Sequence, residues 1–222
     1  MSRAVDLVIC DMAGTSVLDE GQVPAAFTAA LQAHGVAVTP AAIEALRGAS
    51  KRDAIAALLP RGADHEQRTD VVYARFRTEL ERVFAAGVRE VPGARQVFDT
   101  LRAAGIRVAL NTGFDRDTAE LLLHALRWDD GVVDAVLCGD DVARGRPAPD
   151  LVLACMAATG ITDPRRVAVV GDTVLDLQAG QAAGAACVVG VLTGAHGRDR
   201  LAREPYARLV AAITDLPPLL GL

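Results

Sequence analysis

Residues 4–15 read AVDLVICDMAGT, an apolar run that ends at Asp11 and continues into a glycine-containing turn. A short run of Val, Leu, Ile and Cys without polar alternation is typical of a parallel strand covered on both faces. Ligand chemistry in parallel sheets gathers at the carboxyl ends of the strands. The stretch therefore predicts the first strand of an α/β sheet with an acidic side chain at its functional end.

Four further runs of the same kind recur along the chain, and helical stretches lie between most of them. Alternation of strand and helix predicts a doubly wound, Rossmann-like parallel sheet. The expected strands are residues 4–11, 106–113, 133–141, 166–172 and 185–191, and the expected helices are residues 93–105, 116–128, 148–160 and 174–184.

Between the first strand and the rest of the sheet the alternation stops, and only helical patterns follow. We expect an all-helical cap inserted over the strand ends, so that residues 1–18 and 91–222 form the core and residues 19–90 form the cap. Glycine and proline near residues 18–21 and 88–92 predict hinges between the two. The expected cap helices are residues 24–35, 39–48, 51–60 and 66–87.

Composition excludes several function classes. The chain has 222 residues, a net charge of −5 and no basic run, so nucleic acid is not an expected partner. No segment approaches the length of an apolar membrane span, and the first residues do not resemble a secretion signal, so we predict a cytoplasmic protein with no membrane partner. The four cysteines are widely spaced, which predicts neither a zinc site nor disulfides.

Three aspartates are expected to meet at one edge of the sheet. Asp11 follows the first strand, Asp172 follows the fourth, and Asp176 lies one helical turn later. Clustered carboxylates repel one another unless a cation lies among them, and oxygen ligands favour Mg²⁺. Any one of these aspartates could instead be a helix cap. Their combined placement predicts a magnesium site beside a carboxylate nucleophile.

Lys51, in the stretch RGASKRDAI at residues 47–55, is the only lysine. The chain holds 23 Lys and Arg residues, so the other 22 are arginines. A lysine that is desolvated or crowded by cations can lose its proton and attack a carbonyl, whereas an arginine cannot. Arg47 and Arg52 would lower the pKa of Lys51 if they point toward it. Chance in an arginine-rich composition is the alternative explanation.

Four motifs resemble those of the haloacid dehalogenase superfamily, in the same order and at ordinary spacing: DMAGT (11–15), NTG (111–113), GRPAPD (145–150) and GDTVLDLQAG (171–180). The resemblance implies Mg²⁺ dependence and an aspartyl-enzyme intermediate on Asp11. It also implies that Thr112 bonds the phosphoryl oxygens and that Arg146 replaces the lysine of most members. The implied substrate-binding residues include Gly14, Thr15 and Gly113, and the implied metal ligands are Asp11, Ala13, Asp172 and Asp176.

Ala13 occupies the position at which phosphatases of this superfamily carry an aspartate that protonates the leaving alkoxide. The phosphonatase branch is similar to this sequence there, with alanine in a D-x-A-G-T motif and arginine in the third motif. In that branch a cap lysine forms a Schiff base with the substrate carbonyl, and the carbon fragment leaves as an enamine. The segment RGASK resembles the one that carries this lysine, so the resemblance implies that role for Lys51.

Three positions depart from the phosphonatase pattern. Arg47, Ala54 and Phe114 stand where that branch has methionine, histidine and often tyrosine. The expected substrate is a 2-oxoalkylphosphonate, phosphonoacetaldehyde or a close analogue, and these departures favour an analogue over phosphonoacetaldehyde itself. Arg47 either recognises an extra anionic or polar substituent on the substrate, or is a solvated cap residue.

Three functions remain open from the sequence. The leading one is a C–P hydrolase that uses Lys51 and Asp11. The second is a phosphatase for small phosphate esters, and the third is a non-catalytic protein that binds a phosphorylated ligand. The expected partner is in each case a small organophosphonate or phosphate ester, and the cap helix at residues 24–34 could also form a homodimer.

Overall fold

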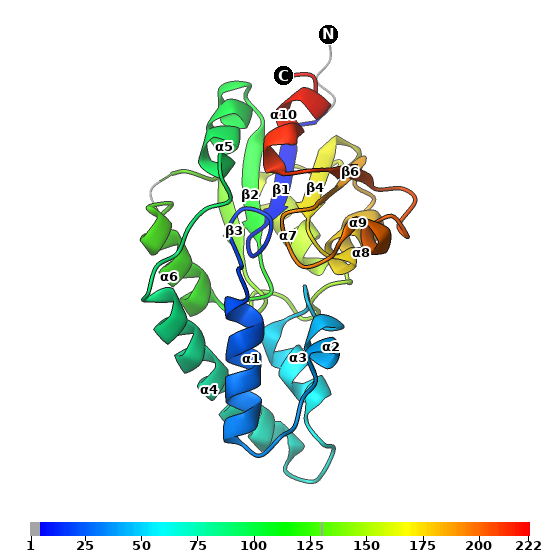
Figure 1. Cartoon of the computed structure of the whole chain (residues 1–222). Helices are drawn as coiled ribbons and strands as arrows, with labels where there is room; N and C mark the ends of the chain where they lie inside the picture. The colour runs from blue at the N-terminus through cyan, green and yellow to red at the C-terminus, as the bar shows by residue number, and fades with distance from the viewer. Residues whose placement is uncertain (1–4, 130) are drawn as a thin grey trace.

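A six-stranded parallel sheet lies at the centre of the computed structural model, which describes residues 5–129 and 131–222 (Figure 1). The strand order is β3-β2-β1-β4-β5-β6, and every pair is parallel. This confirms the predicted α/β class; Ala4, the first residue of the expected first strand, lies outside the described residues. The strands are β1 Leu7–Asp11, β2 Arg107–Asn111, β3 Ala135–Leu137, β4 Val167–Gly171, β5 Cys187–Val191 and β6 Arg208–Val210.

Two strands differ from the sequence-based expectation. β3 has three residues, because the chain turns after Leu137 and the Cys138 amide donates to the Asp141 carboxylate at 2.7 Å. β6 was not predicted, since Arg208–Val210 is a short, partly exposed segment at the edge of the sheet without an apolar run. Neither difference affects the central strands that carry the candidate site.

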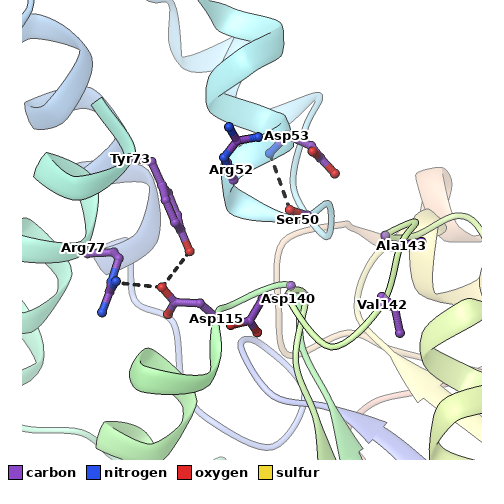
Figure 2. Close-up of a pocket in the computed structure, with 12 residues that line it drawn as sticks. Ser50, Arg52, Asp53, Tyr73, Arg77, Asp115, Asp140, Val142 and Ala143 are labelled. Carbon is purple, nitrogen blue, oxygen red and sulfur yellow. Dashed lines mark hydrogen bonds and ion pairs between the residues drawn. The ribbon is translucent and has the colours of Figure 1, made fainter. Parts of the chain in front are cut away.

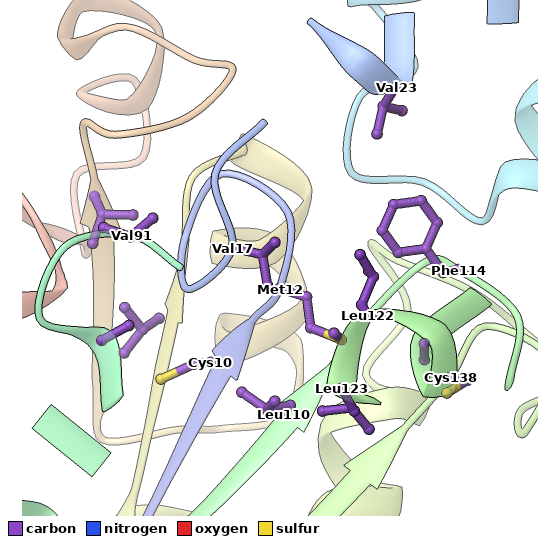
Figure 3. Packing of buried hydrophobic residues seen from close by; sticks show 14 of the residues in the cluster. Cys10, Met12, Val17, Val23, Val91, Leu110, Phe114, Leu122, Leu123 and Cys138 are labelled. Atoms are coloured by element: carbon purple, nitrogen blue, oxygen red, sulfur yellow. The ribbon is translucent and has the colours of Figure 1, made fainter. Parts of the chain in front are cut away.

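Helices cover both faces of the sheet. Alternate residues of β1 point to opposite sides: Val8 and Cys10 pack with α5 and α6, and Leu7 and Ile9 pack with α7 and α8. Figure 3 shows part of the first cluster, around Cys10, Leu110 and Leu122. The helices and 3-10 turns from residue 94 onward are α5 Ala94–Ala103, α6 Arg116–Leu126, α7 Asp150–Thr159, η1 Pro164–Arg166, α8 Val174–Ala182, α9 Arg198–Leu201, η2 Ile213–Asp215 and α10 Leu216–Leu219.

Helices α1 to α4 form the insertion between β1 and α5, and they lie beyond the carboxyl ends of the strands (Figure 1). Phe27 and Phe76 pack together inside it, with ring centroids 4.5 Å apart. α2 is shorter than the expected helix at residues 39–48: it ends at Glu44, and Gly48, with a φ of 90°, lies in the turn that follows. The helices are α1 Gln22–Ala33, α2 Pro40–Glu44, α3 Lys51–Leu58 and α4 His65–Phe84.

The two chain segments that join the insertion to the sheet run side by side. The Leu18 amide donates to the Arg89 carbonyl at 2.9 Å, and the Val91 amide donates to the Ser16 carbonyl at 2.9 Å. The two predicted hinge segments thus lie next to each other, although hinge motion itself stays a prediction. Among the described residues, no helix combines the length and apolar character needed to cross a membrane.

Candidate active site

Three aspartates meet at the carboxyl ends of β1 and β4, which are neighbours in the sheet. Asp11 is the last residue of β1, Asp172 follows β4, and Asp176 lies in the first turn of α8. All three are buried, and one carboxylate oxygen from each lies within 4.8 Å of the others. The structure therefore brings together the carboxylates that the sequence placed at this edge.

Arg146 lies between two of these carboxylates. Its Nη2 is 2.7 Å from Asp11 Oδ1, and its Nη1 is 2.8 Å from Asp176 Oδ1. Nη2 also donates to Asn111 Oδ1 at 2.6 Å, and the side chain is 2% exposed. Asn111 belongs to the quoted NTG motif but received no role from the sequence, because its contact depends on the pairing of β2 with β1.

Asp172 is enclosed by main chain and by the first motif. The Thr15 hydroxyl donates to its Oδ1 at 3.2 Å, and the Ala195 amide donates to its Oδ2 at 2.6 Å. A Cβ on Gly14, whose φ is 91°, would lie 2.5 Å from Asp172 Oδ2. Burial and the charges of Asp11 and Asp176 raise the pKa of Asp172 well above its ordinary value.

The carboxylate cluster suits a hard divalent cation. Burial raises the pKa of Asp11, and the Arg146 guanidinium opposes that shift only in part. Asp176 Oδ1 is buried and lies 2.8 Å from Arg146 Nη1. Carboxylate oxygens that crowd together in this way are the ligands that Mg²⁺ prefers. Ala13 borders the same cavity and has only main-chain polar atoms to offer.

Lys51 approaches the cluster from the insertion. It is the first residue of α3, is 8% exposed, and donates from Nζ to the Ala49 carbonyl at 3.2 Å. Its Nζ also lies 4.9 Å from the centroid of the Phe114 ring. Burial lowers the pKa of Lys51 to about 8; Asp11 opposes this shift, and Arg146 and Arg47 strengthen it.

Arg52 does not point toward Lys51. Its guanidinium pairs instead with Asp70, at 2.8 Å, and with Glu66 on α4. Helical geometry explains this outcome, because adjacent residues on a helix face different directions. Of the two arginines in the segment, Arg47 lowers the pKa of Lys51, whereas Arg52 pairs with carboxylates of α4.

Arg47 and Asp19 form a buried ion pair beside Lys51. The Arg47 Nη2 lies 2.5 Å from Asp19 Oδ2, with side-chain exposures of 11% and 2%. Arg47 is therefore not a solvated residue. Asp19 was missed by the sequence analysis, because a single aspartate in a linker carries no pattern that reveals its partner 28 residues away.

A small cavity of about 20 Å³ joins the two sides of the site. The sheet side contributes two of the three clustered carboxylates, Asp11 and Asp172, together with Arg146 and Thr112. The Thr112 hydroxyl accepts from the Phe114 amide at 3.1 Å. The insertion contributes Asp19, Arg47 and Lys51. The full lining is Asp11, Ala13, Asp19, Val23, Arg47, Gly48, Lys51, Thr112, Arg146, Asp172 and Thr173.

Gly113 forms a close contact between sheet and insertion. Its carbonyl accepts from the Lys51 amide at 3.0 Å, and a Cβ there would lie 2.4 Å from the Ala49 carbonyl oxygen. Only a glycine therefore allows this approach.

A larger pocket of about 320 Å³ lies beside the same contact (Figure 2). There the Tyr73 hydroxyl donates to Asp115 Oδ2 at 2.8 Å, and the Arg77 Nε lies 3.0 Å from the same oxygen. Gly113 is the only predicted site residue in the lining of this pocket. Asp11 and Asp172 of the carboxylate cluster line the small cavity and not this pocket.

Comparison with known proteins identifies related sequences and structures. A family model described as haloacid dehalogenase-like hydrolase matches residues 5–184. A phosphonoacetaldehyde hydrolase of Latilactobacillus sakei is 30% identical over 195 residues, which cover 81% of this chain and 73% of that protein. One from Bacillus cereus is 29% identical over 203 residues, with 86% and 76% covered. A hydrolase structure from Pseudomonas syringae has a TM-score of 0.86 at 25% identity and covers 97% of this chain and 98% of its own. The chain belongs to the haloacid dehalogenase-like hydrolase family.

Proposed function

We propose that this protein is a phosphonatase-like hydrolase that cleaves the C–P bond of a 2-oxoalkylphosphonate. The observation that carries the proposal is the buried amine of Lys51, with a pKa lowered to about 8, on the same small cavity as Asp11. An amine of that kind is a nucleophile toward carbonyls near neutral pH. The relatives named phosphonoacetaldehyde hydrolase support the same substrate class.

The proposed reaction uses two nucleophiles. The Lys51 amine adds to the substrate carbonyl, and loss of water leaves an iminium. The Asp11 carboxylate then attacks phosphorus, and the electron pair of the C–P bond moves into the carbon fragment, which becomes an enamine on Lys51. Water hydrolyses the aspartyl-phosphate; protonation of the enamine carbon and a further water release the carbonyl product. The net change consumes one water and yields phosphate and an aldehyde or ketone.

The remaining predicted residues have supporting roles in this proposal. Mg²⁺ held by Asp11, Asp172, Asp176 and the main chain of Ala13 would neutralise charge on the phosphoryl oxygens. Ala13 provides no general acid, and an enamine leaving group needs none on oxygen. Thr112 and Arg146, together with Gly14, Thr15 and Gly113, would surround the phosphoryl group or hold the groups that do.

The motion and assembly of the protein are also part of the proposal. Residues 19–90 would close as a cap on a core of residues 1–18 and 91–222, because Lys51 and Asp11 come from different sides of the cavity. A homodimer through the cap helix α1 and a cytoplasmic location stay predictions.

Borohydride reduction tests the proposed imine. Protein incubated with Mg²⁺, phosphonoacetaldehyde and borohydride should lose activity and carry a reduced adduct on the Lys51 peptide, measured by mass spectrometry. Lys51→Arg should abolish both labelling and phosphate release. The double variant Lys51→Arg/Arg52→Lys, which moves the amine by one position to an exposed side chain, should be equally inactive.

A second variant separates the two chemical steps. Asp11→Asn should still form the reducible imine but release no phosphate, because the C–P bond then has no nucleophile. Full turnover by Lys51→Arg would refute the imine mechanism. Phosphate release from esters that is insensitive to borohydride, without cleavage of the phosphonate, would identify a phosphatase instead.

A further inference from the structure

We infer that Arg47 and Asp19 form a carboxylate subsite, so that the substrate is a 2-oxo acid whose third carbon carries the phosphonate. This inference rests on the proposed function and narrows its substrate class. Arg47 lies four residues before Lys51 and borders the same small cavity. In the phosphonatase branch that this sequence resembles, the position of Arg47 holds a methionine, so the subsite belongs to this chain's own residues.

The first argument is the burial of a full ion pair at a cavity wall. The Arg47 and Asp19 side chains are 11% and 2% exposed, and both border the cavity that holds Lys51 and Asp11. A buried arginine and carboxylate cost more desolvation energy than a well-packed apolar side chain of similar volume. Stability alone therefore does not explain a charged pair at this position. A charged ligand group in the cavity does.

The second argument is the way Asp19 anchors the guanidinium. Asp19 Oδ1 accepts from the amides of Gly21 and Val23, each at 3.2 Å, which fixes the carboxylate at the start of α1. Its Oδ2 binds Arg47 Nη2 at 2.5 Å. Among the described residues, no other side chain pairs with Arg47. A guanidinium has five donors in a planar fork, so this anchor leaves further donors for a second carboxylate.

The third argument concerns the other cations of the cavity. Arg146 is already engaged by Asp11, Asp176 and Asn111. Lys51 must be neutral to attack a carbonyl, so it does not supply a positive charge to an anion. Arg47 is thus the cation of the cavity that remains for a substrate group other than the phosphonate.

The proposed roles of Lys51 and Asp11 set the order of chemical groups along the substrate. The carbon that Lys51 attacks carries the phosphonomethyl group on one side, which reaches Asp11. Its other substituent is hydrogen in phosphonoacetaldehyde. A carboxylate in place of that hydrogen would share the small cavity with Arg47, which lines it together with Lys51. Cleavage of such a substrate would release a simple 2-oxo acid and phosphate.

The test compares two substrates on variants of the full-length, Mg²⁺-supplied protein. We expect wild-type kcat/KM to be higher for the 2-oxo acid phosphonate than for phosphonoacetaldehyde. Arg47→Met should lower kcat/KM for the acid by about 100-fold, as for loss of a hydrogen-bonded charge partner. The same variant should lower kcat/KM for the aldehyde much less than for the acid, because there it acts only by raising the pKa of Lys51. Arg47→Lys, which keeps the charge without the fork, should recover part of the loss.

Asp19→Asn tests the positioning role. We expect a higher KM for the acid with little change in kcat, because the guanidinium stays charged but loses its anchor. Arg75→Met is the matched control, since Arg75 also pairs with a carboxylate on the cap, Glu79, at 2.6 Å and lies outside the cavity. It should leave both substrates unaffected, and circular dichroism should show that all variants fold.

The outcomes separate the inference from the proposed function. If the aldehyde is cleaved and Lys51 is labelled, but the acid is not preferred, the carboxylate subsite is refuted and the proposed function stands. Equal losses for both substrates in Arg47→Met would assign Arg47 to the phosphonate group and also refute the subsite. Failure of the wild type to cleave either phosphonate would overturn both.

Discussion

The two sides of the site hold their charges in different ways. On the core side Arg146 lies between Asp11 and Asp176, and Thr15 and Ala195 hold Asp172. On the cap side the Lys51 amine contacts the Ala49 carbonyl and the Phe114 ring. On the core side, Arg146 pairs with two of the three carboxylates, whereas on the cap side burial disfavours the charged form of the Lys51 amine. From this difference we expect Arg146 to stabilise the fold and Lys51 to be the reactive group.

Stability measurements on two methionine variants test this contrast most strongly. Arg146→Met leaves two buried carboxylates without their cation, so the free energy of unfolding without added metal should fall by about 3–5 kcal/mol. Lys51→Met removes a desolvated amine and should raise the free energy of unfolding at pH 7 by about 1–3 kcal/mol. Urea unfolding in chelator gives both values.

The result would be most informative if the two variants behaved alike. Equal destabilisation would mean that Lys51 is a structural cation of the site, as Arg146 is, and the contrast between the two sides would disappear. Added Mg²⁺ should reduce the loss in the free energy of unfolding of Arg146→Met, because a bound cation also compensates the charge of the carboxylates.

Gly113→Ala tests the contact between the two sides. Its Cβ would lie 2.4 Å from the Ala49 carbonyl oxygen and 3.4 Å from Lys51 Nζ, so the cap segment must shift away from the core. A displacement of about 1 Å can cost about 100-fold in rate, and we expect a loss of that size in kcat/KM for C–P cleavage.

The control for this variant is Gly197→Ala, because among the described residues, its two chain neighbours aside, no atom lies within 4 Å of a Cβ at Gly197. Its activity should stay at the wild-type level. Wild-type activity in Gly113→Ala would show that the closed contact between Gly113 and the cap is not needed for catalysis.

Sequence reasoning found the parts of the site that depend on local pattern. The apolar run before Asp11 and the matching one before Asp172 define buried strands, and the parallel sheet then places both aspartates at one edge. Lys51 was found because it is the single lysine in a recognisable cap segment. The order of the strands and the sequence motifs are enough to predict where these residues lie.

The missed residues depend on contacts between distant segments. Asp19 meets Arg47 only when the linker, α1 and the turn after α2 fold together, and Asn111 meets Arg146 through the pairing of β1 and β2. β6 lacked a pattern because a three-residue edge strand is specified by its neighbour β5 more than by its own sequence. The sequence did not determine whether the Arg52 side chain points toward Lys51, because this depends on which face of α3 carries Arg52.

The pH dependence of imine formation gives the smallest expected effect and the sharpest test of the cap side. The reactive form is the free amine, and the pKa of Lys51 is lowered from 10.5 to about 8. The rate of borohydride labelling should therefore rise about tenfold from pH 7 to pH 9 and level off above that, whereas an ordinary lysine would rise about 100-fold over the same range. Arg47→Met should move the inflection upward, because Arg47 helps to lower this pKa.

The same lowered pKa has a consequence for stability with a definite sign. Because the unfolded chain binds the proton more tightly than the folded one, the contribution of Lys51 to the free energy of unfolding should fall as the pH drops from 10.5 to about 8, and stay constant below. Subtracting the pH profile of the free energy of unfolding of Lys51→Met from that of the wild type isolates this contribution. A labelling rate still climbing steeply at pH 9, together with a flat stability difference, would show that the amine titrates as in solvent. The rate of imine formation would then depend on the substrate carbonyl, and the cap would only position the Lys51 amine.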